Sequence, residues 1–590
     1  MHILLVADAF NSLSQRLHAE LRDRGHTVAV ELALDPASLP DAVRRHAPRL
    51  VVAPMLKTAI PREVWSAYTC LVVHPGPVGD RGPSSLDWAI HDDADQWGVT
   101  VLQADAEMDA GDVWASASFP MTSAAKSDLY RNEVSDAATA AVLVAVERFA
   151  SGTYTPRAQA AGTGLARPYL DQSVRRIDWA SEPTESVVRK LRAADSQPGV
   201  LDELHGEQWY LHGGHPEDRL RGDPGELLAT RAGAICRATI DGAVWIPELR
   251  GRRRQGQPPT FKLPAVQALA GRLPSLPESP APLRPDADRR TWSDISYRED
   301  RNIGFLSFSF PSGAMSTEQC RRLLAAYRQA CSRPTSVLVL GGGRIFSNGI
   351  HLNVIEAAGD PAAESWANIN AMDDLVEAVL TTTDRLVVSA VGGHAAAGGA
   401  MLALAADEVW CRSGAVLNPH YRLMGLYGSE YWTYTLPRRA GREAADRLMS
   451  QALPVSAATA RHLGLVDRLV GSTPQDFTAQ VRRLAAHLAA LPAAQSRIAA
   501  KKAERDRDES IRPLAVHRAQ ELARMRRTFF DPDAPYHALR RAFVRKEKPP
   551  HTPPHLTVPL PGRRTADPSQ TGADVTGLAH PDAASAPDAC

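Results

Sequence analysis

The sequence is poor in cysteine and lacks the cysteine patterns of metal sites and disulfide frameworks. Its six cysteines, among 590 residues, include no CxxC pair and no accompanying group of histidines. Structural zinc sites and disulfide-rich domains both require such spacings. We therefore expect reduced, mostly buried thiols, and we assign no metal to the protein.

Charge of one sign is not in excess, and long hydrophobic runs are missing. Lysine and arginine together number 67, as do aspartate and glutamate, so no overall positive field can hold a nucleic-acid backbone. The first apolar run has no basic segment before it, and the apolar stretch at 395–406 is too short to span a bilayer. These absences predict a cytoplasmic protein with small-molecule substrates and neither a nucleic-acid nor a membrane partner.

The length and pattern of the chain predict a multidomain α/β protein, because 590 residues exceed what one hydrophobic core usually organises. Short β-rich runs alternate with helical stretches over residues 1–110, which is typical of a parallel α/β sheet. Five prolines at 274–285 favour an extended connection. Ser316 and Gln319 predict a capping box for a helix at 317–331. We predict an α/β domain at 1–165, a small β-rich, OB-like subdomain at 166–272, a proline-rich linker at 273–290, a second α/β domain at 291–475, a helical extension with a solvated charged face at 476–547, and a disordered tail at 548–590.

A histidine and an aspartate in the first domain form one candidate site. His74 ends the strand predicted at 70–73, and open α/β sheets bind ligands at the carboxyl ends of their strands. Asp109 follows the next predicted strand, at 99–103. Histidine can shuttle a proton near neutral pH while a carboxylate holds it in place. The pair therefore suits a transfer that passes through a tetrahedral intermediate, although a structural role for a strand-end histidine is the alternative.

The first 250 residues resemble the formyltetrahydrofolate-dependent formyltransferases. The resemblance rests, in order and spacing, on His74-Pro75, Asp80-Arg81-Gly82, Asp87-Trp88-Ala89-Ile90, Gly98-Val99-Thr100 and Met108-Asp109-Ala110-Gly111-Asp112. It implies a Rossmann-like domain, 10-formyltetrahydrofolate as the formyl donor, and His74 and Asp109 as catalytic residues. Arg81 is a candidate folate ligand, with a structural ion pair as the alternative. The family usually has an asparagine where this chain has Val72, so the contact of that asparagine is absent or comes from another residue.

Two small-residue turns, at 346–352 and 391–400, each follow a predicted strand and lead into a helix. Backbone N–H groups at helix starts can bind a developing oxyanion, although tight packing alone is the alternative. Together with Ala405-Ala406-Asp407, Leu417-Asn418-Pro419 and Gly464-Leu465-Val466-Asp467, these turns resemble the crotonase (enoyl-CoA hydratase/isomerase) superfamily over residues 300–475.

The crotonase resemblance implies an α/β spiral domain that binds an acyl-CoA. By position, the thioester oxygen would be bound by the backbone N–H groups of Asn348, or its neighbour Gly349, and of Gly398. The two catalytic glutamates of the hydratases are replaced, by residue counting, with Met401 and Tyr421. Hydration of an enoyl thioester is therefore not expected.

The segment after the second glycine-rich turn offers replacement acid and base groups. Tyr421 and Glu430 lie in an aromatic run that would face the acyl pocket in a crotonase fold. We predict that these two residues take the acid/base roles. Packing for the tyrosine and a surface charge for the glutamate are the alternative.

The two units in one chain, with the strings Phe10-Asn11-Ser12-Leu13 and Leu426-Tyr427-Gly428-Ser429-Glu430-Tyr431-Trp432, resemble the HypX/HoxX family of hydrogenase maturation factors nearly to Lys546. The resemblance implies formyl transfer from 10-formyltetrahydrofolate to coenzyme A (CoA), then cleavage of formyl-CoA to carbon monoxide (CO) and CoA. It also implies the [NiFe]-hydrogenase maturation machinery as a partner. Two alternatives stay open: a formyltransferase for an amine acceptor fused to an unrelated acyl-CoA enzyme, and a non-catalytic maturation scaffold.

Overall fold

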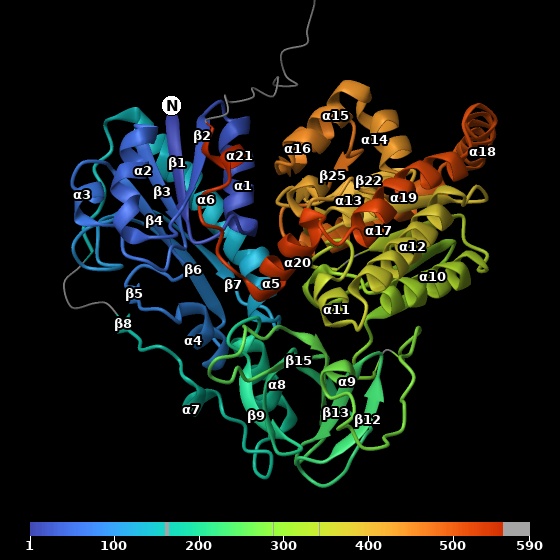
Figure 1. The fold of residues 1–590 in the computed structure, drawn as a ribbon, viewed down its shortest axis with the longest axis horizontal. Coiled ribbons are helices and arrows are strands. Elements are labelled where there is room, and N and C mark those ends of the chain that lie inside the picture. The colour runs from blue at the N-terminus through green and yellow to red at the C-terminus, as the bar shows by residue number, and fades with distance from the viewer. Residues whose placement is uncertain (160–164, 287, 342, 559–590) are drawn as a thin grey trace, which may run out of the picture.

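The computed structural model describes residues 1–159, 165–286, 288–341 and 343–558. Figure 1 shows three lobes: the N-terminal α/β domain, the small β-rich domain and the second α/β domain with its helical extension. The multidomain α/β fold predicted from the sequence is confirmed. The residue boundaries proposed for the domains stay a prediction.

The N-terminal domain contains a six-stranded sheet in the order β2-β1-β3-β4-β6-β7. Its first four strands in that order are parallel. The prediction of a wholly parallel sheet is wrong, because β6 pairs antiparallel with β4, and β7 antiparallel with β6. The connection from β4 to β6 holds β5 and a seven-residue helix, and it returns to the sheet edge at which β4 ends instead of crossing to the opposite edge. The elements are β1 (His2–Ala7), α1 (Ser12–Asp23), β2 (Thr27–Leu32), η1 (Pro36–Ser38), α2 (Leu39–His46), β3 (Leu50–Pro54), α3 (Arg62–Trp65), β4 (Cys70–His74), β5 (Asp80–Arg81), α4 (Ser85–His91), β6 (Gln96–Gln103), β7 (Val113–Pro120), α5 (Lys126–Arg131) and α6 (Glu133–Ser151).

The small domain contains two four-stranded antiparallel sheets, in the orders β16-β15-β10-β9 and β11-β14-β13-β12. Its described strands form no closed barrel. The proline-rich segment runs along one edge, where Ser279 N–H donates to the Thr230 carbonyl at 2.8 Å. The elements are α8 (Thr184–Ala194), β9 (Val200–Leu204), β10 (Glu207–His212), β11 (His215–Glu217), β12 (Leu227–Arg231), β13 (Ala234–Ala238), β14 (Ala243–Ile246), β15 (Glu248–Gly251) and β16 (Leu263–Pro264).

The second α/β domain contains a six-stranded sheet in the order β17-β18-β19-β20-β22-β25, in which only the β17 pairing is antiparallel. The predicted helix at 317–331 is confirmed with its capping box, in which Ser316 and Gln319 bond each other reciprocally. The elements are β17 (Ile295–Asp300), β18 (Ile303–Phe308), α10 (Thr317–Cys331), β19 (Val337–Gly341), α12 (Pro361–Leu380), β20 (Leu386–Val391), β21 (Ala395–Ala396), α13 (Gly398–Leu404), β22 (Glu408–Cys411), β23 (Val416–Asn418), η3 (Tyr421–Met424), α14 (Trp432–Ala440), β24 (Val455–Ser456) and β25 (Arg468–Leu469).

The helical extension packs on this domain through α17 (Pro474–Ala490), α18 (Ala494–Ile511), α19 (Leu514–Phe530) and α20 (Pro535–Arg545). The prediction that its charges form only a solvated face is wrong. Glu521 on α19 is fully buried, and Arg518 bonds the carboxylates of Asp374 and Glu377 on α12. A buried charge needs partners from neighbouring elements, and the helical periodicity of the extension does not identify them.

After α20 the chain returns to the N-terminal domain, where the last described helix, α21 (Pro554–Thr557), lies beside β2 (Figure 1). Thr552 accepts from Leu32 N–H at 2.9 Å and donates to Glu31 at 2.5 Å, while Leu556 is buried in the core of that domain. The prediction of disorder is therefore wrong for residues 548–558, because Thr552 and Leu556 find partners far away in the sequence. The rest of the predicted tail, 559–590, lies outside the described residues.

A buried arginine joins the two α/β domains. Arg412 is fully buried and donates to Asp136 at 2.8 and 3.0 Å and to Asn132 at 3.0 Å, both on or beside α6. It also donates to the Gly392 carbonyl at 2.8 Å. The guanidinium thus ties the N-terminal domain to the loop after β20.

We expect Arg412→Ala to lower the free energy of unfolding by roughly 3 kcal/mol, because it leaves buried acceptors without their donor. Urea denaturation with and without the substitution measures this. Arg468→Ala is the matched control, since its side chain is 53% exposed and bonds Glu408 at 3.4 Å; it should change stability by less than about 0.5 kcal/mol. Equal effects of the two substitutions would contradict the role of Arg412.

Candidate functional sites

In the N-terminal domain His74 lies between two carboxylates at the end of β4. Its Nε2 is 2.9 Å from Asp80 Oδ2, and its Nδ1 is 3.4 Å from Asp109 Oδ1. Asp109 Oδ2 accepts from Gly82 N–H at 3.4 Å. The structure thus brings His74 and Asp109 together and adds Asp80, which the sequence analysis quoted in a motif but did not assign to the site.

The route by which Asp109 reaches His74 differs from the sequence-based expectation. Because β6 is antiparallel to β4, its end at Gln103 lies opposite Leu71, near the start of β4. The loop between β6 and β7 therefore has to bring Asp109 back to His74. Gln159 fixes this loop by donating to the carbonyls of Asp109 and Gly111 at 3.0 and 2.9 Å.

The two carboxylates determine the charge of His74. Burial alone would lower the pKa of the imidazole, but hydrogen bonds to Asp109 and Asp80 outweigh burial and raise the pKa to about 9. Burial likewise acts to raise the pKa of Asp109, yet the bond to His74 leaves that pKa below its usual value. An imidazolium between two carboxylates is therefore the stable state near neutral pH.

The remaining predicted residues of this site have other surroundings. Arg81 donates to Glu107 at 2.6 Å, so the ion pair that the sequence left as an alternative does form, while its buried Nε has no hydrogen-bond partner among the described residues. Val72 packs against the apolar cluster on its face of the sheet. Gly76 lies against the site, since an added Cβ would be 2.2 Å from Asp80 Oδ2.

In the second α/β domain Tyr421 and Glu430 meet in the interior. The Tyr421 hydroxyl donates to Glu430 Oε2 at 2.7 Å, and Ser429 N–H donates to the same oxygen at 3.1 Å. Both side chains are buried, with Glu430 only 1% exposed. Neither the packing role nor the surface charge that the sequence left open describes this pair.

Glu430 lies directly beside the predicted oxyanion-binding turns. A Cβ added to Gly398, the first residue of α13, would be 2.2 Å from Glu430 Oε1, and one added to Gly349 would be 3.1 Å from Gly398 N. Gly349 and Gly398 thus adjoin each other, and Gly398 adjoins the carboxylate. Asn348 N–H donates to the Gly313 carbonyl at 2.7 Å, whereas Gly349 N–H donates to the Ser347 hydroxyl at 3.2 Å. The longer bond to a hydroxyl that can rotate favours Gly349 over Asn348 as the second donor.

Two further buried carboxylates surround Glu430, and the sequence analysis found neither. Asp373 on α12 accepts from Glu430 N–H at 2.8 Å and from Ser429 Oγ at 2.8 and 2.9 Å. Glu521 on α19 accepts from Tyr431 N–H and Thr433 N–H, both at 2.9 Å. No motif marks these positions; an acidic residue inside an otherwise apolar helix face is the only signal in the sequence.

The carboxylates shift one another's protonation. Burial, followed by the charge of Asp373, raises the pKa of Glu430 well above its usual value. Burial raises the pKa of Asp373 to about 7 and that of Glu521 to about 8. Burial and the charge of Glu430 also raise the pKa of Tyr421. Groups with such shifts suit acid/base work near neutral pH.

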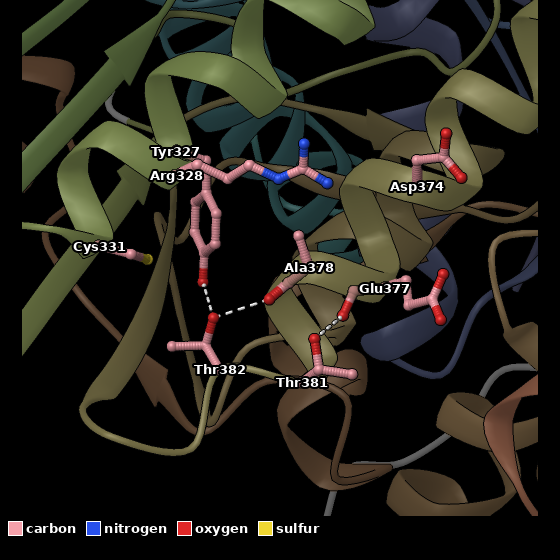
Figure 2. Close-up of a pocket in the computed structure, with 8 residues that line it drawn as sticks. All are labelled: Tyr327, Arg328, Cys331, Asp374, Glu377, Ala378, Thr381 and Thr382. Carbon is pink, nitrogen blue, oxygen red and sulfur yellow. Dashed lines mark hydrogen bonds between the residues drawn. The ribbon is translucent and has the colours of Figure 1, made fainter.

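A surface cavity of about 360 Å³ lies between α10 and α12 and is separate from both sites. Figure 2 shows that its polar groups bond each other: the Tyr327 hydroxyl meets Thr382 at 2.8 Å, and Thr381 donates to the Glu377 carbonyl at 2.8 Å. None of the predicted site residues lines it.

Within the described part of the chain, no group of three or more His, Cys, Asp and Glu side chains could hold a metal ion. No described helix is long and apolar enough to cross a membrane.

Comparison with known proteins assigns both modules. Residues 170–260 match the formyl transferase C-terminal domain family, and residues 301–553 match the enoyl-CoA hydratase/isomerase family. A methionyl-tRNA formyltransferase of Geobacter sulfurreducens is 24% identical over 39% of this chain and 71% of its own. Fold, sites and matches together define a formyltransferase module joined to a crotonase-like module.

The whole chain has full-length relatives. The hydrogenase maturation factor HoxX of Bradyrhizobium diazoefficiens is 47% identical over 94% of this chain and 96% of its own. The crystal structure of HypX from Aquifex aeolicus in complex with tetrahydrofolic acid superposes with a TM-score of 0.91, at 43% identity, over 96% of this chain and 99% of that one. The chain belongs to the HypX/HoxX family of hydrogenase maturation factors.

Proposed function

We propose that the protein makes carbon monoxide for [NiFe]-hydrogenase maturation in two steps. The N-terminal module transfers a formyl group from 10-formyltetrahydrofolate to the CoA thiol, and the crotonase-like module splits formyl-CoA into CO and CoA. The observation that carries the proposal is the buried carboxylate of Glu430, which is bonded to Tyr421 and lies against the Cα of Gly398.

The second step needs a base and little else. Formyl-CoA has no carbon chain on which a hydratase could act, so removal of the formyl proton and departure of the thiolate complete the reaction. Glu430 takes the proton, the C–S electron pair goes to sulfur, and the thiolate regains a proton to give CoA. The Gly349 and Gly398 amides hold the thioester oxygen and orient the C–S bond, while Tyr421 relays or retains the proton on Glu430.

The first step uses the His74 pair. The CoA thiol releases its proton to solvent as its sulfur forms a bond to the formyl carbon, and the tetrahedral intermediate collapses when the folate nitrogen is protonated and the C–N bond breaks. The His74 imidazolium supplies the proton to the nitrogen and regains one from solvent, while Asp109 and Asp80 keep the ring charged and oriented. The folate bound in the Aquifex aeolicus relative supports a folate substrate here.

Positive charge gathers where the three lobes meet, which supports CoA as a substrate. Burial lowers the pKa of Lys546, and the neighbouring Lys262, Arg250 and Lys57 lower it further. These cations come from the end of α20, the small domain and the N-terminal domain. Lys262 is ion-paired with Glu248, and the remaining positive charge of the cluster suits the phosphates of CoA.

The pH dependence of the first step follows from His74. We expect formyl transfer to decline as the pH rises through about 9, because the imidazolium then loses the proton it donates. Asp80→Asn should move this decline to lower pH, since it removes one of the two carboxylates that stabilise the charge. Rates with both enzymes in the same buffers measure the shift and cancel the ionisation of CoA. Superimposable profiles would contradict the role of Asp80.

The direct test incubates the purified protein with 10-formyltetrahydrofolate and CoA and detects CO with a haemoprotein trap. CO should form only when both substrates are present. If formyl-CoA accumulated without CO, the result would support the first step and contradict the second. Formyl transfer without CoA would indicate an amine acceptor, and no folate turnover at all would support the scaffold alternative.

A further inference from the structure

The turn that carries Glu430 is held by backbone bonds to buried carboxylates. Ser429 N–H donates to Glu430 itself, Glu430 N–H to Asp373, and Tyr431 and Thr433 N–H to Glu521. Trp432 N–H instead bonds the Ser429 carbonyl. Four of the five consecutive amides from Ser429 to Thr433, at the start of α14, thus donate to three carboxylates. The N-terminus of a helix stabilises nearby negative charge.

This turn has a conformation that its residues do not adopt readily. Glu430 has a φ of 58° and Tyr431 a φ of 59°, both in the left-handed region that favours glycine. Non-glycine residues stay there only when their surroundings fix them. The bonds from Asp373 and Glu521 to the amides of these same residues provide that restraint.

We propose that Asp373 and Glu521 are positioning residues for Glu430. Together they hold the turn in the one geometry that aims Glu430 Oε1 at Gly398, and α19 of the helical extension is thereby part of the second site. The inference rests on the proposed function for its kinetic consequences only.

The titratable and charged groups that face Glu430 come from several elements. Tyr421 approaches from η3, Asp373 and Arg518 from α12 and α19, Glu521 from α19, and Cys320 from α10. Arg518 is the single cation in this set, and its Nε is 3.8 Å from Asp373 Oδ2. It bonds Asp374 and Glu377 more closely, at 2.6 and 2.8 Å. The negative charge of Asp373 therefore acts on Glu430 with little compensation.

Glu521→Gln and Asp373→Asn test the proposal without changing side-chain size. The amide nitrogen of Gln cannot accept, so one of the two backbone donors at Tyr431 and Thr433 loses its partner. We expect kcat for CO release from formyl-CoA to fall about 10- to 100-fold in each variant, with KM changed less than about 3-fold, since misplacing a reacting group affects the chemical step. Asp374→Asn is the matched control, because Asp374 shares Arg518 at 2.6 Å but, among the described residues, bonds none of the turn amides.

A readout without catalysis separates this proposal from the proposed function. Hydrogen–deuterium exchange of the peptide covering 429–433 should accelerate at least about 10-fold in Glu521→Gln and not in Asp374→Asn, with the melting temperature of each variant confirming that it is folded. Asp373→Asn should also move the rising limb of the pH–kcat profile to lower pH, because it removes a negative charge beside the base.

Three results would overturn either the positioning role or the proposed function. Unchanged kcat and unchanged exchange in both variants would overturn the positioning role. Faster exchange without any loss of kcat would show that the turn is held by these residues but that Glu430 does not depend on it, which also overturns the proposal. If the unsubstituted protein releases no CO from formyl-CoA, the proposed function fails, and the exchange data alone still decide whether Asp373 and Glu521 hold the turn.

Discussion

Replacing Glu430 with glutamine should reduce CO release from formyl-CoA by about 10³-fold, because the variant keeps the side-chain volume but removes the carboxylate that lies against Gly398. Positioned bases typically contribute 10²- to 10⁴-fold. The measurement supplies formyl-CoA directly and traps CO with a haemoprotein, so that the first step does not limit the rate. Formyl-CoA should remain intact in the variant.

Tyr421→Phe separates the two members of the pair. It removes the 2.7 Å bond to Glu430 but leaves the base, so a loss of roughly 10-fold is expected, smaller than that of Glu430→Gln. Formyl transfer to CoA by the N-terminal module should be unchanged in both variants. If both variants released CO at the normal rate, the second site would have been assigned to the wrong residues.

Replacing His74 with glutamine should lower the formation of formyl-CoA from 10-formyltetrahydrofolate and CoA by about 10³-fold, since the proton donor to the leaving nitrogen is lost. Asp109→Asn should cost less, about 10²-fold, because Asp80 still stabilises the imidazolium at 2.9 Å. Single-turnover formation of tetrahydrofolate measures both.

The matched control for His74 is His46→Gln. His46 lies in the same domain and also bonds a carboxylate, Glu31, at 3.2 Å, but it is remote from the β4 end. It should leave formyl transfer unchanged. Cleavage of added formyl-CoA should stay normal in His74→Gln; a parallel loss of both activities would point to a general folding defect and contradict the division of labour between the modules.

The two sites use carboxylates in opposite ways. At His74 two carboxylates face one imidazole ring. They stabilise its protonated form, so the pKa of the imidazole rises to about 9. At Glu430 carboxylates face carboxylates: burial and the charge of Asp373 raise the pKa of Glu430, and burial raises the pKa of Asp373 to about 7. The first arrangement makes a proton donor, whereas the second makes a base that holds its proton firmly once it has taken it.

Local patterns in the sequence determined much of the fold. The helix α10 begins and ends where the residue pattern predicts, and β4 begins at the predicted Cys70 and extends one residue past the predicted end, because alternation, capping and glycine act over a few neighbouring residues. Motif spacing also identified His74, Asp109, Tyr421 and Glu430, since these residues lie at strand ends and turns that the family strings mark. Their catalytic roles stay proposals.

Only the tertiary structure decided what surrounds these residues. The antiparallel course of β6, the return of Thr552 and Leu556 to the N-terminal domain, and the meeting of Glu521 with the Glu430 turn join segments up to several hundred residues apart. The partners that hold a buried carboxylate, or that set the direction of a strand, are distant in the sequence. Their contacts therefore produce no periodic pattern in the residues around it. The sequence therefore names the reacting groups, whereas the packing of distant elements sets their geometry and charge.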